Sequence, residues 1–238
     1  MGAPKLDRLK RSSLTSQKQI HVANIGAIIL AAGESARFGK PKQLIQVGGK
    51  SLIRRAVDAA SRAGCSPIVI VVASDKDANR STSRTEATVP NDGLIEAISR
   101  ELKNTDVAIV ENKHWQRGIG TSIRTGVQHL IDDTSEVDGI VLLVCDQPFV
   151  DAQTIHGLVA LRQKTSKAII ASSYANTLGI PALFDRSCFQ ELLALPDTNG
   201  AKPVILENRH RVAEFPFPKG AIDIDTVQDL EKICSRGR

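Results

Sequence analysis

The chain has 238 residues, of which 42% are hydrophobic and only 3% aromatic, so we expect one aliphatic core, as in a parallel sheet covered by helices. The net charge is +5, but residues 1–24 hold five basic side chains against one acidic one, so most of the excess lies in this leader. A nucleic-acid surface spread over the chain is therefore not favoured. A membrane span is not expected either, because the longest uncharged apolar run, Ile25–Ala32, falls far short of the roughly 20 residues required.

We interpret residues 1–24 as a basic, disordered arm and residues 25–238 as one domain. In this domain, strands and helices alternate. A first strand runs from residue 25 to a glycine-bearing loop, and Ser51 is the expected cap of a helix that Gly64 ends. Further strands are predicted at 67–73, 106–110, 139–144 and 168–172, and further helices at 91–103, 121–131 and 151–163. This alternation implies parallel strands joined by right-handed crossovers.

The last third of the chain is less regular. Short strands are predicted at 180–184 and 212–215, with a helix at 185–195 between them. Residues 222–224 precede a C-terminal helix, which has Asp225 or Thr226 as its cap. The four cysteines are far apart and form no Cys-x-x-Cys pair, so we expect neither structural zinc nor disulfides, and a reducing cytoplasm suits the chain.

Residues 25–42 carry the strongest functional signal. The first strand ends at Gly33, and the loop that follows carries Arg37, Gly39 and Lys42. Small residues let backbone N–H groups approach phosphate oxygens, which the arginine can clamp and the lysine can neutralise. Five residues separate the two glycines, and Lys-Pro stands where a P-loop has Lys-Ser/Thr. The segment therefore predicts a phosphate loop of another kind.

A carboxylate, Asp146, follows the apolar strand at 139–144 after one cysteine. Burying it would be costly without compensation. In an open parallel sheet, ligands bind beyond the carboxyl ends of the strands, where both Asp146 and the phosphate loop lie. Magnesium takes one or two carboxylates together with phosphate oxygens. We therefore interpret Asp146 as a Mg²⁺ ligand, with a plain strand-end turn residue as the alternative.

Two further segments have weaker signals. The glycine-rich segment 112–126 opens a predicted helix and offers backbone donors to an anion, but it lacks the third glycine of a dinucleotide fingerprint. Its Trp115, taken alone, is interpreted as a packing residue. Near the C-terminus, Asp223 and Asp225 alternate with isoleucines, and the second of them is equally consistent with a helix cap and with a metal ligand.

Five motifs, in this order, resemble the MobA/MocA-like nucleotidyltransferases over residues 25 to about 235, and together they are most similar to the molybdenum cofactor cytidylyltransferase branch. The motifs are Leu30-Ala31-Ala32-Gly33-x-Ser35-x-Arg37-x-Gly39-x-Pro41-Lys42, Asn112-x-x-Trp115-x-x-Gly118-x-x-x-Ser122, Cys145-Asp146-Gln147-Pro148, Gly179-x-Pro181-x-x-Phe184 and Asp223-x-Asp225-Thr226-x-x-Asp229-Leu230.

The resemblance implies an α/β, Rossmann-like three-layer α/β/α NTP-transferase fold with a mostly parallel central sheet. It implies a Mg²⁺-dependent transfer of CMP from CTP to the phosphate of molybdopterin, with release of pyrophosphate, and a partner in molybdoenzyme maturation. Arg37, Lys42 and Asp146 would be catalytic, and Asp146 and Asp225 would hold the metal. The implied nucleotide contacts are Leu30, Ala31, Ala32, Gly33, Ser35, Arg37, Gly39, Lys42, Asn112, Gly118 and Ser122.

One motif departs from the family's pattern, on the side that would meet the acceptor. Residues 195–202 read LPDTNGAK where the family has Gly-Asp-x-Gly-Ala-Arg, and Phe38 replaces a methionine. Ala32 and Pro41 are similar to the CTP-using branch. A sugar or polyol phosphate is the alternative acceptor, and a non-catalytic nucleotide-binding regulator is the alternative function. A nicotinamide-dependent oxidoreductase would need Gly-x-Gly-x-x-Gly after the first strand, which the sequence lacks.

Overall fold

The computed structural model describes residues 23–33, 41–74, 93–133 and 137–235. Nearly all of the predicted N-terminal arm falls outside these ranges. So do residues 34–40 of the predicted phosphate loop, which include the predicted site residues Ser35, Arg37 and Gly39. No helix in the described ranges is both long and apolar enough to cross a membrane.

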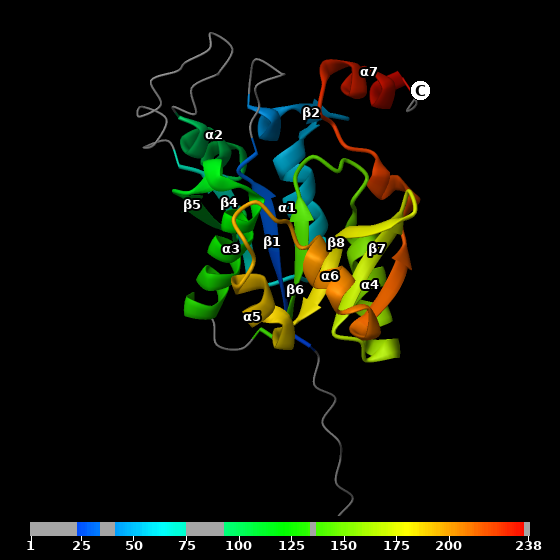
Figure 1. Cartoon of the computed structure of the whole chain (residues 1–238). Helices are drawn as coiled ribbons and strands as arrows, with labels where there is room; N and C mark the ends of the chain where they lie inside the picture. Colours follow the sequence, from blue (N-terminus) through cyan, green and yellow to red (C-terminus); the bar gives the residue numbers. More distant parts are fainter. Residues whose placement is uncertain (1–22, 34–40, 75–92, 134–136, 236–238) are drawn as a thin grey trace, which may run out of the picture.

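A seven-stranded sheet forms the centre of the molecule, in the order β5-β4-β1-β6-β8-β7-β9 (Figure 1). The strands are β1 (Ile25–Ala31), β4 (Ile68–Ala73), β5 (Ala108–Asn112), β6 (Gly139–Val144), β7 (Ile169–Tyr174), β8 (Thr177–Asp185) and β9 (Val212–Pro216). All neighbours are parallel except that β8 runs antiparallel to both β6 and β7. The predicted mostly parallel sheet is confirmed.

Helices cover both faces of this sheet, which gives the predicted three layers. One face packs against α1 (Leu52–Arg62), α2 (Leu94–Glu101) and α4 (Ala152–Thr165), and the other against α3 (Ile119–Asp133), α5 (Phe189–Leu193) and α6 (Lys202–Glu207). Successive residues of β1 serve alternate faces, since Ile29 joins the first core and Ile28 the second. Both are fully buried.

A smaller apolar cluster lies beside the main core. It joins the hairpin of β2 (Gln46–Val47) and β3 (Lys50–Ser51) to α7 (Val227–Ser235), through the fully buried Ile224 and the partly buried Leu230. Two short 3₁₀ turns matter for the site: η1 (Lys42–Leu44) and η6 (Pro218–Ala221). The C-terminal segment is therefore anchored next to the residues that follow the phosphate loop.

Several local predictions are confirmed by specific contacts. The Ser51 hydroxyl accepts from the backbone N–H of Arg54 at 3.1 Å and so caps α1, and Gly64 follows that helix with a φ of +77°. Asp151 caps α4 in the same way, through the backbone N–H of Thr154 at 2.8 Å.

Other local predictions need correction. The helix expected at 185–195 is split into the 3₁₀ turn η4 (Arg186–Cys188) and α5, and helix α6 was not predicted. Helix α2 begins at Leu94, and the first two residues of its predicted range, 91–92, lie outside the described residues. Residues 222–224 lie in no strand, and the Ile224 N–H donates to the carbonyl of Asp146, just after β6, at 3.0 Å.

Candidate active site

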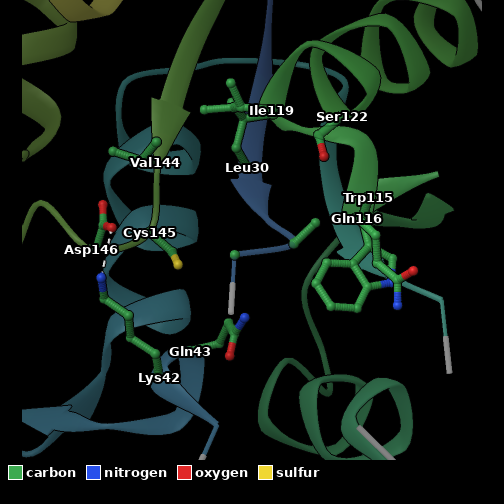
Figure 2. A pocket seen from close by; sticks show the side chains of 12 residues that line it. Leu30, Lys42, Gln43, Trp115, Gln116, Ile119, Ser122, Val144, Cys145 and Asp146 are labelled. Atoms are coloured by element: carbon green, nitrogen blue, oxygen red, sulfur yellow. Dashed lines mark hydrogen bonds and ion pairs between the residues drawn. The ribbon is translucent and has the colours of Figure 1, made fainter. Parts of the chain in front are cut away.

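The carboxyl ends of β1 and β6 open into one cavity of about 300 Å³ (Figure 2). The two strands are direct neighbours with Leu30 opposite Val144, and the Cys145 N–H donates to the Leu30 carbonyl at 3.3 Å. The loop after β1 and the residues after β6 therefore leave the sheet side by side. The lining residues are Leu30, Ala32, Gly33, Lys42, Gln43, Trp115, Gln116, Ile119, Ser122, Val144, Cys145 and Asp146.

Lys42 is the electrostatic centre of this site. Its side chain is 12% exposed, and its Nζ donates to Asp146 Oδ2 at 2.8 Å and to Asp225 Oδ1 at 2.7 Å. Burial by itself would lower the pKa of Lys42, but the two carboxylates outweigh it and hold that pKa above its ordinary value. The lysine is therefore fully charged at neutral pH, and the two carboxylates lie within two hydrogen-bond lengths of each other.

Asp225 reaches Lys42 because the chain returns across the end of β6. The bond from Ile224 N–H to the Asp146 carbonyl fixes the segment, and Ile224 is buried in the small cluster beneath it. The cap of α7 is Thr226, whose hydroxyl accepts from the Asp229 N–H at 3.2 Å while the Asp229 carboxylate accepts from the Thr226 N–H at 3.0 Å. The Asp225 carboxylate is thus engaged with Lys42 rather than with the helix.

Negative charge accumulates at this corner of the site. Partial burial of the Asp223 carboxyl, together with repulsion from Asp146 and Asp225, raises the pKa of Asp223 to about 6. In the described residues, no three Asp, Glu, His or Cys side chains are grouped closely enough to hold a metal ion by themselves. Two adjacent carboxylates nevertheless suit Mg²⁺, which completes its shell with phosphate oxygens and water. The donor set fits a divalent cation bound jointly with a phosphorylated ligand.

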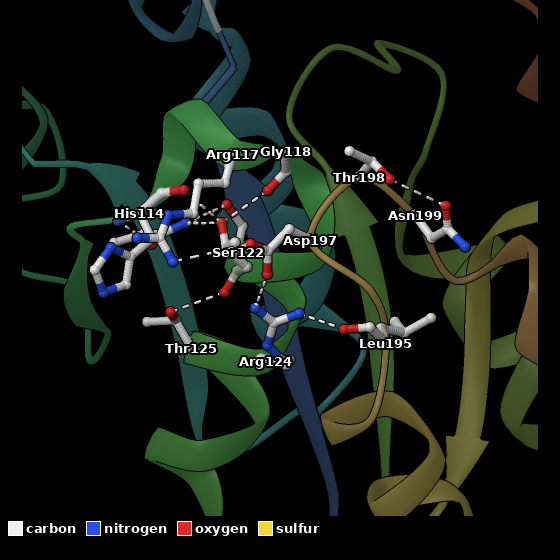
Figure 3. A network of polar contacts seen from close by, with 12 residues as sticks. His114, Arg117, Gly118, Ser122, Arg124, Thr125, Leu195, Asp197, Thr198 and Asn199 are labelled. Carbon is white, nitrogen blue, oxygen red and sulfur yellow. Dashed lines mark hydrogen bonds and ion pairs between the residues drawn. The ribbon is translucent and has the colours of Figure 1, made fainter.

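The glycine-rich segment packs closely against residues 195–199, and Arg124 joins the two through hydrogen bonds to the Leu195 carbonyl and the Asp197 carboxylate (Figure 3). A Cβ on Gly118 would come within 2.5 Å of the Asp197 carbonyl oxygen, and one on Gly120 within 2.1 Å of the Pro196 carbonyl oxygen. The Gly120 N–H donates to the Asp197 carbonyl at 2.9 Å, and the Gly118 N–H donates to the Trp115 carbonyl at 3.1 Å. Gly118 is thus engaged beside the cavity and is not among its lining residues.

Asn112 lies behind the cavity wall and is buried. Its Nδ2 donates to Thr121 Oγ1 at 2.7 Å and to Ser122 Oγ at 2.9 Å, and its Oδ1 accepts from the His114 N–H at 2.8 Å. The amide is therefore used within the protein, where it orients Ser122. Of the three nucleotide contacts predicted from this segment, Ser122 lines the cavity, Asn112 supports Ser122 from behind, and Gly118 lies beside the cavity.

Sequence reasoning missed Gln43 and gave Trp115 only a packing role, although both line the cavity. Gln43 is 2% exposed, and its Nε2 donates to the Ala31 carbonyl at 2.5 Å, which fixes the end of β1. A glutamine beside a lysine in a polar stretch normally indicates a solvated position. The available signal was its place directly before the apolar pair Leu44-Ile45.

Cys145 also lines the cavity. Burial, aided by the charge of Asp146, raises the pKa of its thiol to about 12. The thiol is therefore protonated at neutral pH and is not a nucleophile.

Comparisons with known proteins identify a matching family and several related proteins. The profile of the family described as MobA-like NTP transferase domain matches residues 27–212. Bifunctional protein GlmU of Sorangium cellulosum is 31% identical over 147 residues, and the match covers 61% of this chain but only 28% of that protein. Purine catabolism protein PucB of Bacillus subtilis is 23% identical over 210 residues, with 87% of this chain and 94% of PucB covered.

A solved structure shares the fold over nearly its whole length. Rv0371c from Mycobacterium tuberculosis H37Rv has a TM-score of 0.69 and 24% identity, with 90% of this chain and 98% of that chain covered. Its complex with manganese has a TM-score of 0.62 and 26% identity, with 90% and 99% covered.

Proposed function

The chain belongs to the MobA-like NTP transferase family, and on this premise we propose that it transfers CMP from CTP to the phosphate of molybdopterin and releases pyrophosphate. The observation that carries the proposal is the contact of Lys42 with both Asp146 and Asp225 at the edge of a cavity bounded by Ala32 and Gly33. A cavity of about 300 Å³ lies at the lower end of the range for small-molecule sites. The preference for CTP rests on the resemblance of the first motif.

The proposed reaction needs no protein nucleophile, because the acceptor phosphate is already an anion. One of its oxygens attacks the α-phosphorus of CTP in line, and the bond from that phosphorus to the bridging oxygen breaks, so that the electron pair leaves with pyrophosphate. The main obstacles are repulsion between anions and charge on the leaving group. Lys42 supplies fixed positive charge against both, and we assign the same role to Arg37.

Asp146 and Asp225 are the side chains that would hold Mg²⁺. When bound, this ion supplies additional positive charge to the triphosphate. The carboxylates themselves orient Lys42, since both accept a hydrogen bond from its ammonium. Gln43, next to Lys42 in the chain, fixes the end of β1 through its hydrogen bond to the Ala31 carbonyl.

Pyrophosphate release is the direct test. The purified chain is incubated with Mg²⁺ and, in turn, CTP, GTP, ATP or UTP, each with and without molybdopterin. We expect release with CTP and molybdopterin together and not with CTP alone. Parallel reactions contain a sugar phosphate or a polyol phosphate. Release with one of these instead of molybdopterin would give the chain another acceptor, and CTP binding without release in any reaction would make it a regulator.

The surrounding assignments remain part of this proposal. Residues 1–24 are proposed as a basic arm outside the nucleotidyltransferase domain at 25–238, and contact with a partner in molybdoenzyme maturation follows from the proposed product. A reducing cytoplasm is proposed because Cys65, Cys145 and Cys188 are buried free thiols.

A further inference from the structure

Gln147 is a buried amide directly after Asp146, and it connects segments that are far apart in the sequence. Gln147 is only 7% exposed. Its Nε2 donates to the Gly220 carbonyl at 2.9 Å and to the Ile180 carbonyl at 3.2 Å. The end of β6 is thereby linked both to β8 and to the turn η6.

The link to Gly220 bears directly on Asp225. Gly220 lies in η6, and five residues further along the chain is Asp225, whose side chain is 56% exposed and so has little packing of its own. The other link is the bond from Ile224 N–H to the Asp146 carbonyl at 3.0 Å. The segment that carries Asp225 is therefore attached at both ends to the dipeptide Asp146-Gln147.

A role in packing alone does not explain this side chain. Gln147 Oε1 is buried without a hydrogen-bond partner, which costs free energy that an apolar side chain of similar size would avoid. The Ile180 carbonyl has a second donor, the Tyr174 hydroxyl at 2.9 Å, so the link to β8 does not depend on the amide alone. The contacts that depend on the amide are thus those with the segment that carries Asp225, namely the bond to the Gly220 carbonyl and an interaction with the Asp223 carboxyl.

We propose that Gln147 is a positioning residue whose amide holds η6 so that the Asp225 carboxylate stands beside Asp146, where the two can share a divalent cation. The inference rests on the proposed function in its assignment of the metal to these two carboxylates. It predicts that losing the amide has the same consequence for cation binding as losing Asp225 itself.

The test is a titration of the full-length protein with Mn²⁺ in the absence of nucleotide, with free Mn²⁺ followed by electron paramagnetic resonance. Gln147→Met and Asp225→Asn are each expected to weaken Mn²⁺ binding about tenfold, which is the effect of about 1.4 kcal/mol. The double variant should bind no more weakly than Asp225→Asn alone, because both changes remove the same contribution. Additive losses, or wild-type affinity in Gln147→Met, would overturn the inference.

Ser172→Ala is the matched control. It removes a side-chain donor to β8, the Ser172 hydroxyl that bonds the Pro181 carbonyl at 2.6 Å, and leaves the contacts of Gln147 intact, so Mn²⁺ affinity should stay at the wild-type value. A tenfold loss in this variant would show that β8, rather than η6, transmits the effect, and the inference would fail. If Gln147→Met does not fold, Gln147→Asn replaces it, since its amide is one methylene too short for Gly220 and the same weakening is expected.

One more variant, Asp146→Asn, read together with Asp225→Asn, separates this inference from the proposed function. If Asp146→Asn and Asp225→Asn both keep wild-type Mn²⁺ affinity, the metal assignment itself is wrong and the positioning role falls with it. If both weaken binding while Gln147→Met does not, the metal assignment stands and only the positioning role is wrong. Pyrophosphate release is measured separately and decides the acceptor.

Discussion

Lys42→Met is the most informative single change, because its two expected effects have opposite directions. The substitution removes an ammonium that lies 2.8 Å from Asp146 and 2.7 Å from Asp225, and it keeps most of the side-chain volume. Without nucleotide, that ammonium competes with a metal ion for the same oxygens. Two unit charges about 4 Å apart attract each other by about 1 kcal/mol in water. Because Asp225 is exposed, solvent screens its attraction to Lys42 almost as strongly as bulk water would. We therefore expect Mn²⁺ to bind roughly fivefold more tightly.

Turnover should change the other way. In the proposed function, Lys42 supplies preorganised positive charge to the triphosphate. Removing one such group typically costs a factor of about 10² or more in rate, or roughly 2.7 kcal/mol of transition-state stabilisation. Asp146→Asn separates the two roles, because it should lose both Mn²⁺ affinity and a similar factor in kcat/KM. The assays are Mn²⁺ titration and pyrophosphate release with CTP and the acceptor identified above.

Lys50→Met is the control for a general change in charge. Lys50 pairs with Asp58 on the surface and does not line the cavity, so both measurements should stay at their wild-type values. The reasoning fails if Lys42→Met keeps wild-type kcat/KM, or if it binds Mn²⁺ more weakly than the wild type does.

Two further predictions concern stability. Partial burial opposes ionisation of Asp185, but hydrogen bonds from a backbone amide and from Arg162 outweigh it and hold the pKa of Asp185 below its ordinary value. Asp185→Asn should therefore lower the free energy of unfolding in urea by about 1 kcal/mol at pH 7. The difference should begin to shrink as the pH falls below about 3.9, the ordinary aspartate pKa, and should be lost only below the depressed pKa of the folded wild-type carboxyl; a constant difference would contradict this. Gly120→Ala should lower the free energy of unfolding by about 3 kcal/mol, because the added Cβ would lie 2.1 Å from the Pro196 carbonyl oxygen. Gly200→Ala is the control and should be near neutral, because its Cβ would meet nothing closer than 3.7 Å. Equal melting temperatures for the two variants would refute the predicted contact.

The central strands and the first helix were predictable because their signals are local. The strands β4 and β6 are continuous apolar runs bounded by turn residues, and they appear within a residue of the expected ranges. Helix α1 carries its own start and stop in Ser51 and Gly64. These patterns depend on neighbours in sequence, so the sequence alone is sufficient to place them.

The last third could not be predicted as well, because its elements depend on distant partners. Helix α6 has six residues and begins with Lys-Pro, so no periodicity can establish itself. Strand β8 is longer than expected because it pairs with both β6 and β7. The turn between β7 and β8 consists of Ala175 and Asn176, at φ values of +45° and +58°. An alanine at positive φ gives no turn signal.

The site shows the same division between local and distant information. Asp146 was identifiable from its place after an apolar strand, and Lys42 from its place in a basic loop. Their contact spans 104 residues and that of Lys42 with Asp225 spans 183, so the first depends on β1 and β6 being neighbours and the second on the chain returning past β6. No periodicity in the sequence encodes that return. The return depends on single contacts, such as those of Gln147 and Ile224. Asp225 could therefore be suspected from its motif, whereas the residues that hold it in place could be identified only from the structure.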